Sequence, residues 1–442
     1  MKKLMLSTAS LLAALPALAQ EATTEATAAV ETVAEAAAPV MDKGDVSWMM
    51  MSTVLVLFMT LPGLALFYGG LVRSKNMLSI LMQTTMIACL VMVLWVLYGY
   101  SVTFGGGTSP YWGGLGKLFL KGVTPDSMSA TFSAGYVIPE YVFIVFQMTF
   151  AAITPGLIIG AFAERVKFTA VLAFCALWVT LVYFPVAHMV WDASGLIFQM
   201  GAIDFAGGTV VHINAGIAAL VGCLVIGKRV GFGKENMAPH SMVMTMIGAS
   251  MLWVGWFGFN VMSAQTLDKI SGLVAANSLM AMAGGTIAAL IAGRNDPGFA
   301  YNGPLAGLVA VCAGSDLMHP LGALATGFIA GGLFVFAFTF TQNRLKIDDV
   351  LGVWPLHGLC GVWGGLAAGI FGAEAFGGLG GVSLAAQAIM TGMAIIVALV
   401  GGTVVYGALK AFVGIRLDQE EEYNGADLTI HRITATPDTR DL

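Results

Sequence analysis

The sequence predicts an all-α polytopic membrane protein with eleven transmembrane helices. Three observations support this fold class: an apolar composition, apolar runs of membrane-spanning length and an uneven placement of positive charges. Of the 442 residues, 58% are apolar and only 10% are charged, whereas about a quarter of the residues in a soluble domain are charged. The predicted spans are 48–72, 79–104, 140–163, 168–187, 206–227, 241–261, 272–294, 303–318, 321–341, 353–373 and 385–411.

The two ends of the chain differ in composition from the spans. Residues 1–19 have the positive start, the apolar stretch and the small-x-small site of a signal peptide, and an uncleaved anchor helix is the alternative. Residues 20–45 are Ala, Thr, Val and Glu with few bulky side chains, which predicts a disordered periplasmic lead-in. A membrane domain over 46–412 and a cytoplasmic tail over 413–442 follow.

Positive charges between the spans indicate the orientation of the chain. With the mature N-terminus outside, one side of the membrane carries twelve Lys and Arg residues and the other carries four. Because cytoplasmic loops are richer in Lys and Arg, this distribution predicts a periplasmic N-terminus and a cytoplasmic C-terminus. The residues on the predicted cytoplasmic side are Arg73, Lys75, Arg165, Lys167, Lys228, Arg229, Lys234, Arg294, Arg344, Lys346, Lys410 and Arg416.

The sequence lacks the motifs that are typical of several other function classes. The five cysteines lie in or beside apolar runs without a C-x-x-C pair, so we interpret them as packing residues. No P-loop motif is present, which argues against transport driven by ATP. No cofactor, no metal and no nucleic-acid partner is expected, because no ligand set stands at metal-binding spacing and the chain is mostly apolar.

An internal repeat indicates where the functional centre lies. Asp204 and Asp349 each precede a histidine by eight positions, and the two histidines, His212 and His357, are 145 residues apart. They fall on the fifth and tenth predicted spans, which predicts two inverted five-helix repeats plus a final helix. Chance in a glycine-rich chain is one alternative, and a structural hydrogen bond between helices is another. If the repeat is real, the two histidines converge near the middle of the membrane.

The motifs around these histidines resemble a known family. The segment 204–216, DFAGGTVVHINAG, resembles the signature of the Amt/MEP/Rh ammonium transporter family, and the resemblance covers about residues 46 to 415. Further matching segments are 67–73, 95–100, 146–151, 160–165, 187–191, 227–234, 255–260 and 353–358. The chain is therefore similar to bacterial Amt-type channels of the inner membrane.

The resemblance implies a homotrimer with one pore in each protomer, and it implies roles for individual residues. The outer recruitment site for ammonium is implied to be Trp191, Phe150 and Ser263. The pore gate is implied to be Phe150 and Phe259, and the pore histidines are implied to be His212 and His357. Residues implied to support the pore structurally are Asp204, Trp256 and Gln147.

The resemblance implies a transporter and not an enzyme. Ammonium would be recruited at the outer aromatic site, would lose a proton in the apolar pore and would pass along the twin histidines as ammonia. Two alternatives stay open: an ammonium sensor, and a Rh-like facilitator of ammonia or carbon dioxide. An intramembrane hydrolase built on the histidines and Asp204 is disfavoured, because no G-x-S-x-G or H-E-x-x-H motif is present.

Three segments depart from the family pattern. Asp192 follows Trp191 where a glycine run is common, and the turn 315–320 adds an aspartate and a histidine to the outer face. The tail keeps an acidic run but has an atypical ending over 430–436. Because the tail has few apolar residues, we expect it to be loosely held until a partner such as a PII-type regulatory protein binds at the cytoplasmic face.

Overall fold

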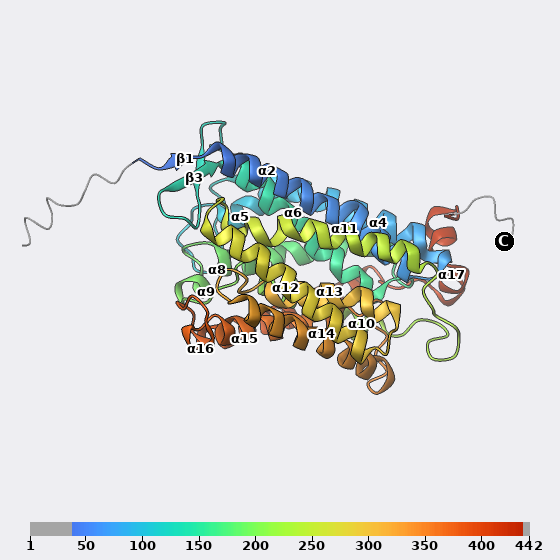
Figure 1. Ribbon diagram of the computed structural model, residues 1–442. Coiled ribbons are helices and arrows are strands. Elements are labelled where there is room, and N and C mark those ends of the chain that lie inside the picture. Colours follow the sequence, from blue (N-terminus) through green and yellow to red (C-terminus); the bar gives the residue numbers. More distant parts are fainter. Residues whose placement is uncertain (1–37, 436–442) are drawn as a thin grey trace, which may run out of the picture.

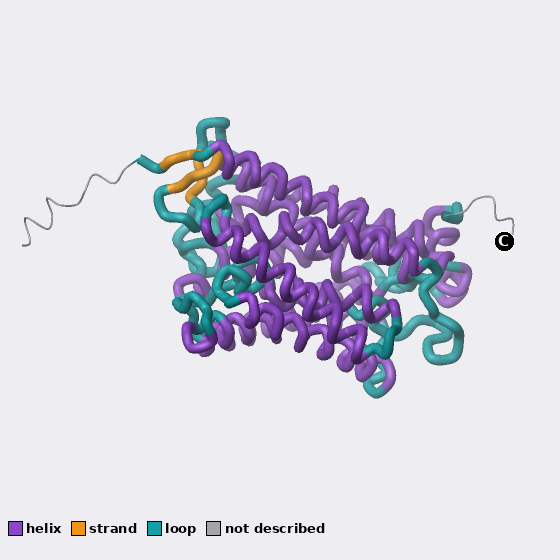
Figure 2. Tube along the Cα trace, in the orientation of Figure 1, coloured by secondary structure: helices purple, strands orange, loops and turns teal. Residues whose placement is uncertain are grey.

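The computed structural model describes residues 38–435, so the predicted signal peptide (1–19) and most of the predicted lead-in lie outside the described residues. The described chain is a bundle of long helices that run side by side between the two ends of the molecule (Figure 1). Three short strands gather at one end of the bundle, and the last helical turns of the chain lie at the opposite end (Figure 2).

Several predicted spans are composed of more than one helical segment. The first half of the bundle contains α2 (Lys43–Phe58), η1 (Met59–Leu64), α3 (Ala65–Leu71), α4 (Met77–Leu94), η3 (Trp95–Gly99), α5 (Tyr100–Phe104), α6 (Glu140–Phe162), α7 (Phe168–Trp178), η5 (Val179–Tyr183), α8 (Phe184–Trp191), α9 (Leu196–Gln199), η6 (Gly208–Ile213) and α10 (Asn214–Ile226). The second half contains α11 (Met242–Asn260), η7 (Val261–Ala264), α12 (Lys269–Ala292), α13 (Pro297–Val311), α14 (Pro320–Asn343), η8 (Trp354–Leu359), α15 (Cys360–Phe371) and α16 (Leu384–Phe412), followed by α17 (Gln419–Asn424) and η10 (Asp427–His431) in the tail. Short 3-10 turns in the loops are η2 (Ser74–Asn76), η4 (Leu118–Leu120) and η9 (Glu374–Phe376).

Within the described residues, nine helical segments are long and apolar enough to cross a membrane. They correspond to nine of the predicted spans. The other two predicted spans, 303–318 and 353–373, correspond to the shorter segments α13 and η8–α15. The all-α multi-pass class is therefore confirmed, and the count of eleven stays a prediction that fits this arrangement.

The helix α13 differs most from its predicted span. It begins at Pro297, six residues before the predicted start, because the side chain of Asp296 accepts hydrogen bonds from the backbone N–H groups of Gly298 and Phe299. A proline at the first helical position suits that start. The helix ends at Val311, and the residues 312–318 form turns instead of helix.

The lead-in residues that the structure describes are ordered. Strand β1 (Val40–Met41) pairs in parallel with β3 (Tyr136–Pro139), which pairs antiparallel with β2 (Met128–Ala130). The side chain of Asp42 then caps α2 by accepting from two backbone N–H groups. The first helix of the bundle therefore begins at Lys43, five residues before the predicted first span.

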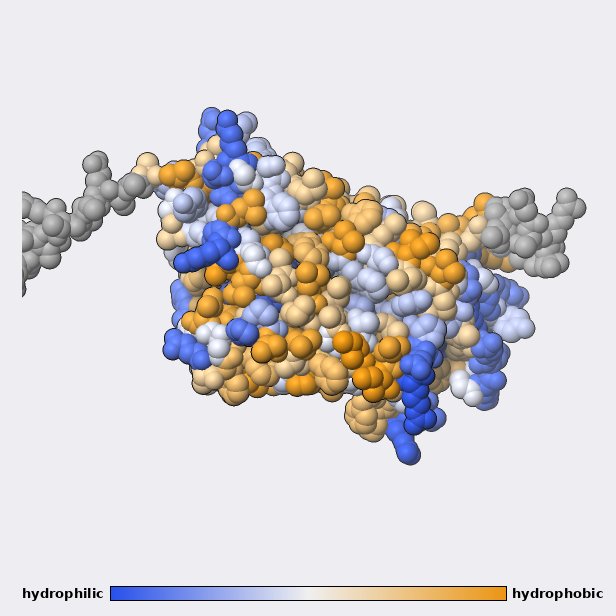
Figure 3. Space-filling view, in the orientation of Figure 1, coloured by the Kyte–Doolittle hydropathy of each residue, from blue (hydrophilic) through white to orange (hydrophobic). Residues whose placement is uncertain are grey.

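The surface of the bundle agrees with a membrane-spanning arrangement. Apolar side chains cover the middle of the face shown in Figure 3, and polar side chains gather toward the two ends. Many large apolar side chains of the long helices are exposed in the described chain, such as Val254, Phe336 and Ile396. Water would disfavour such a surface, whereas a hydrocarbon layer accommodates it.

Several buried charged residues near the end of the bundle that carries the tail form ion pairs. Arg229 donates to both carboxylate oxygens of Asp348, at 3.0 and 2.9 Å, and Glu164 accepts from the backbone and the guanidinium of Arg73 at 2.8 and 2.7 Å. Burial raises the pKa of Asp348, but the hydrogen bond and the charge of Arg229 outweigh it, so this pKa lies below its ordinary value. These ion pairs hold the loops at this end together.

The described part of the tail is packed against the bundle, so the expectation of a loosely held tail is wrong for residues 413–435. Glu422 and Asp427 are each only 1% exposed. Glu422 accepts from the backbone N–H of Val230 at 2.6 Å and pairs with Arg416 at 2.7 Å. The expectation counted apolar anchors alone, whereas the tail is held by carboxylates that accept backbone hydrogen bonds.

The carboxylate of Asp427 completes the start of a distant helix. It accepts from the backbone N–H groups of Leu78 and Ser79, at 2.9 and 2.7 Å, in the first turn of α4. Asn76, which precedes α4, provides no side-chain cap of its own and instead accepts from the backbone N–H of Ala426. The tail thus provides the cap that α4 needs.

The two halves of the bundle meet most closely at glycines. A Cβ atom on Gly216 of α10 would overlap the backbone of Gly358 in η8. A Cβ atom on Gly361 of α15 would lie 3.0 Å from the carbonyl oxygen of Gly208 in η6. Glycine at these positions lets the two helices approach at backbone distance, as small residues do in membrane bundles.

We expect Gly216→Ala to destabilise the protein by about 1 to 3 kcal/mol, because the added methyl group meets backbone atoms that cannot rotate away. The apparent melting temperature in detergent measures this effect. Gly392→Ala in α16 is the matched control, since a Cβ atom there has no neighbour within 4 Å. Equal melting temperatures for the two variants would contradict the close crossing.

Candidate functional site

The two histidines lie on π-helical turns that begin in the same way. Asp204 accepts from the backbone N–H groups of Gly207, Thr209 and Val210, at 3.2, 2.9 and 2.9 Å, at the start of η6. Asp349 accepts from Val353 and Trp354, at 3.0 and 2.8 Å, at the start of η8. Each carboxylate satisfies donors at a helix N-terminus, where the helix dipole also favours negative charge. The two segments that match in sequence therefore also begin their helices in the same way, with an aspartate that accepts hydrogen bonds from the first turn.

Gly207 allows the chain to turn into η6. Its φ of 96° lies in the left-handed region, and a Cβ atom there would lie 2.8 Å from a methyl group of Val211. Only glycine fits this backbone without strain. The turn places His212 on the face of η6 that meets η8.

The imidazole rings of His212 and His357 face each other. Their Nδ1 atoms are 3.1 Å apart, and the ring planes are 15° from parallel with centroids at 5.2 Å. A hydrogen bond between two Nδ1 atoms needs one donor and one acceptor, so a neutral pair holds two complementary tautomers. The side chains are almost completely buried, at 1% and 4% exposure. The Nε2 atom of His212 has no hydrogen-bond partner in the described part of the chain.

The histidine pair lies beside a narrow apolar cavity of about 10 Å³, which has room for about one water-sized molecule. Apart from the two histidines and Tyr68, all its lining residues are apolar. The hydroxyl of Tyr68 is occupied, because it donates to the carbonyl of Leu157 at 2.8 Å. The lining residues are Met59, Leu64, Phe67, Tyr68, Ile153, Leu157, Val211, His212, Leu252, Trp256, Phe259, Leu305 and His357.

Trp256 supports the histidine from one side. Its ring stacks on His212 with centroids 5.5 Å apart and planes 22° from parallel. Its indole N–H donates to the sulfur of Cys312 at 3.3 Å. The tryptophan is fixed at both ends and restricts the rotation of the histidine ring.

Two stacked phenylalanine rings separate this cavity from a second one toward the strand-bearing end. The rings of Phe150 and Phe259 have centroids 4.2 Å apart and planes 24° from parallel. Phe259 lines the histidine cavity, and Phe150 lines the second cavity, which is called the outer cavity below. The pair therefore lies between the two cavities as a closed aromatic barrier.

The outer cavity brings together the residues predicted for recruitment. Trp191 meets Phe150 edge to face at 5.9 Å and donates its indole N–H to the carbonyl of Asp204 at 2.7 Å. Ser263 donates to the carbonyl of Phe259 at 2.9 Å, which leaves the hydroxyl oxygen able to accept. Gln147, predicted to support the structure, lines the cavity itself. The full lining is Phe132, Phe146, Gln147, Phe150, Trp191, Phe205 and Ser263.

Three of these lining residues were not among the predicted site residues. Phe146 lies one helical turn before Phe150 on α6, and the spacing of four residues could have indicated it. Phe205 follows Asp204 directly in the signature segment. Phe132 lies in the loop between β2 and β3, and no sequence signal connects it with the helices.

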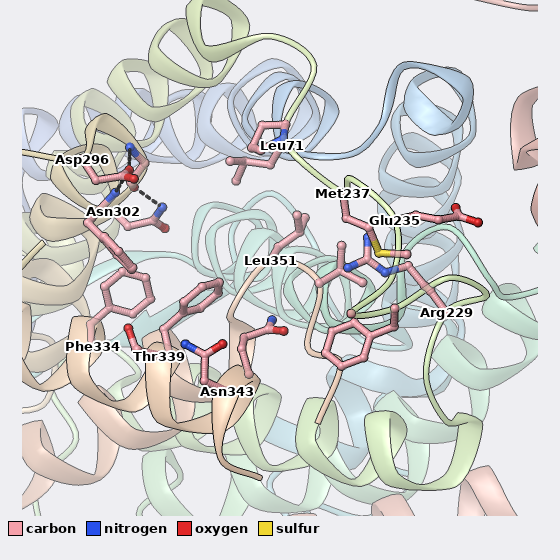
Figure 4. A pocket seen from close by; sticks show the side chains of 18 residues that line it. Leu71, Arg229, Glu235, Met237, Asp296, Asn302, Phe334, Thr339, Asn343 and Leu351 are labelled. Atoms are coloured by element: carbon pink, nitrogen blue, oxygen red, sulfur yellow. Dashed lines mark hydrogen bonds between the residues drawn. The ribbon is translucent and has the colours of Figure 1, made fainter. Parts of the chain in front are cut away.

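A larger vestibule of about 590 Å³ opens at the tail-bearing end of the bundle (Figure 4). Arg229, Glu235 and Met237 of the loop after α10 lie on one side of it, and Asp296 and Asn302 lie on the other. Phe299, Phe334 and Phe338 form an aromatic cluster in its wall. The sequence did not predict this vestibule, because its lining comes from segments far apart in the chain.

In the described part of the chain, no group of three or more His, Cys, Asp or Glu residues is placed to hold a metal ion. The described site has three parts in series: an outer cavity with an indole and a hydroxyl, an aromatic barrier, and an apolar cavity beside two histidines. Such a series can bind a small cation at its outer end, and it disfavours charge farther in.

Comparisons with known proteins identify relatives of the chain. The sequence model of the Ammonium Transporter Family matches residues 47–436. The chain is 39% identical to an ammonium transporter of Bacillus subtilis over 90% of this chain and 100% of the relative. It is 37% identical to the ammonium transporter Amt1 of Archaeoglobus fulgidus, over 89% of this chain and 100% of the relative.

Solved structures with similar folds include a Sensor Amt Protein, with a TM-score of 0.79 and 30% identity over 87% of this chain and 97% of that one. Mep2 of Candida albicans has a TM-score of 0.78 and 29% identity, over 86% of this chain and 88% of that one.

Proposed function

Because the chain belongs to the ammonium transporter family and is a membrane transporter rather than an enzyme, we propose that it moves ammonium by recruiting the ion in the outer cavity and passing ammonia along the histidine pair. The observation that carries this proposal is the stacked barrier of Phe150 and Phe259 between a cavity with polar groups and an apolar one. A cation is stable on the outer side of that barrier and unstable on the inner side.

Recruitment follows from the chemistry of the outer cavity. The faces of Trp191 and Phe150 attract a small cation through the ring quadrupole. The hydroxyl oxygen of Ser263 and the side chain of Gln147 can accept N–H bonds that water makes in solution. Potassium would be attracted to the same rings, so discrimination must come from N–H donation and from proton loss, which potassium cannot perform.

Proton loss follows from the chemistry of the inner cavity. An unpaired charge is strongly disfavoured in an apolar cavity. Desolvation strongly lowers the pKa of an amine, for which the lysine side chain gives a reference value of about 10.4. Ammonium therefore loses its proton more readily as it passes the barrier. The histidine pair can accept and relay a proton, because imidazole exchanges protons near neutral pH. Net charge movement follows if the proton also crosses.

We expect an ammonium jump outside proteoliposomes to produce an inward current in the wild type. Replacing both pore histidines, His212→Ala with His357→Ala, should remove that current or its selectivity over potassium, because the proton relay and the defined polar path are lost together. His319→Ala is the control, since this histidine is exposed outside the pore.

The same measurement separates the alternatives. Ammonium binding without any flux would favour a sensor, an alternative that the similarity to a Sensor Amt Protein keeps open. Uptake of ammonia without current would favour a gas facilitator. A normal ammonium-selective current in the double variant would refute the relay by the histidines.

We expect Ser263→Ala and Trp191→Leu to raise the half-saturating ammonium concentration by about tenfold and to change the maximal current less, because both side chains act on the cation before it is desolvated. Ser250→Ala is the matched control, since Ser250 of α11 makes the same kind of hydrogen bond to the carbonyl four residues earlier. An unchanged concentration dependence in both outer-site variants would move recruitment elsewhere, with Asp192 at the mouth as the next candidate.

We also propose that the tail is the docking surface of a PII-type regulatory protein. The support is the bond between Glu422 and the backbone of Val230, because Val230 belongs to the loop whose residues Arg229 and Glu235 line the inner vestibule. A partner that displaces the tail would displace this loop as well. The homotrimer and the bacterial inner-membrane location stay predictions.

Truncation after Gly425 should abolish inhibition by a purified PII-type protein and leave basal current in place, because the spans and both histidines precede that residue. Flux and pull-down assays measure the two effects. Asp427→Asn is the control, since it weakens the cap on α4 and keeps the docking surface. If the truncated protein is inhibited as strongly as the wild type, the tail is not the receptor.

A further inference from the structure

A separate pocket of about 320 Å³ lies beside the outer cavity. The two share three lining residues, Phe132, Trp191 and Phe205, so a molecule in the pocket lies next to the recruitment site. The remaining lining residues are Ser133, Val190, Phe198, Ala202, Ile203, Asp204, Ala264, Asp268, Ile270, Asp316, Leu317 and Leu379. The proposed transport path does not use this pocket.

Asp316 lies in the turn after α13 and lines the pocket. Its Oδ1 atom is buried and has no hydrogen-bond partner, and no ion pair involves its carboxyl group within residues 38–435. The other two lining carboxylates are already occupied. Asp204 caps η6, and Asp268 accepts from Ser133 and from the backbone N–H of Ile270 at 2.8 and 2.9 Å. Asp316 is therefore the lining carboxylate that is free to bind a ligand.

Two further oxygen atoms at this turn are buried without a partner in the described chain. Asn277 donates its amide to the carbonyls of Ser315 and Met318, at 2.8 and 2.7 Å, which brings its carboxamide to the turn. The Oδ1 atom of Asn277 and the hydroxyl of Ser315 have no partner, and both residues are fully buried. The turn thus has three side-chain oxygens without donors.

A buried carboxylate without donors is energetically unfavourable. Within residues 38–435, the ionised form of Asp316 has no donor at Oδ1 to compensate its charge. A bound cation would stabilise the ionised form, and none of the described Lys or Arg side chains forms an ion pair with it. The aromatic side chains of Trp191, Phe198 and Phe205 add faces that favour a small cation.

We propose that this pocket is a second ammonium-binding site at the outer face, with Asp316 as its anion. The identity of the ion rests on the proposed transport function, whereas the positive charge of the ligand rests on the unpartnered Oδ1 atom of Asp316 in the pocket. Trp191 lines both this pocket and the outer cavity that contains Ser263, so an ion in the pocket lies next to that cavity. Binding in the pocket therefore raises the ammonium concentration at the entrance.

Anomalous diffraction from crystals of the full-length protein soaked with rubidium, a cation close to ammonium in size, tests the binding. The wild type should show a rubidium peak at the carboxyl group of Asp316, and Asp316→Asn should lose it. Asp268→Asn should keep the peak, because Asp268 lines the same pocket with its oxygens already hydrogen-bonded. A wild-type pocket without rubidium, or an equal peak in Asp316→Asn, overturns the proposal.

The ammonium current in proteoliposomes tests the function of the same site. Asp316→Asn should raise the half-saturating ammonium concentration by about tenfold with little change in maximal current, as expected when one charged contact is lost. A lower maximal current with unchanged half-saturation would show a structural role only and overturns the proposal. If the wild type binds rubidium at Asp316 but gives no ammonium current, the transport function fails while the cation site stands.

Discussion

The closeness of two helices at Gly216 and Gly358 is the constraint on which the site depends. Because η6–α10 and η8–α15 approach at backbone distance, two short imidazole side chains can reach each other across the contact. A wider crossing would place lipid-like side chains between the rings, or would leave two buried polar groups without partners. Trp256 and Phe259 of α11 pack against the ring of His212 and complete the wall of the narrow apolar cavity. The proposed histidine site therefore belongs to the interface between the two halves rather than to either half.

The sequence predicted the parts of this arrangement that depend on spacing along one helix. The matched eight-residue distances from Asp204 to His212 and from Asp349 to His357 already placed the two histidines at equivalent positions of the fifth and tenth predicted spans. Parts assembled from distant segments could not be predicted in that way. Phe132 reaches the outer cavity from a loop between two strands, and the inner vestibule joins the loop after α10 to α13 and α14. The tail was misjudged for a related reason: its anchors are backbone N–H groups of other segments, which no composition reveals.

Charged side chains are distributed differently near the tail and around the histidine cavity of the described chain. Near the tail, buried carboxylates such as Glu164 and Asp348 are matched by arginines, which are more weakly hydrated than lysines and bind two oxygens at once. In the described chain the histidine cavity is lined by apolar and aromatic side chains apart from the two histidines and Tyr68, and the nearby Asp204 accepts hydrogen bonds from the N-terminus of η6. Fixed charge is therefore absent from the described lining of the histidine cavity, whereas the proposed anionic site at Asp316 lies on the other side of the aromatic barrier.

The cap that Asp427 provides for α4 has a consequence for biosynthesis. Leu78 and Ser79 are synthesised 349 and 348 residues before the carboxylate that satisfies their backbone N–H groups. During translation α4 therefore forms before its cap exists, and the backbone N–H groups of its first turn gain this partner only after the tail has been synthesised. The turn η10 thus completes the hydrogen bonding of α4, although α4 comes far earlier in the chain. A nascent chain that stops before Asp427 lacks the tail and also leaves the start of α4 without this cap.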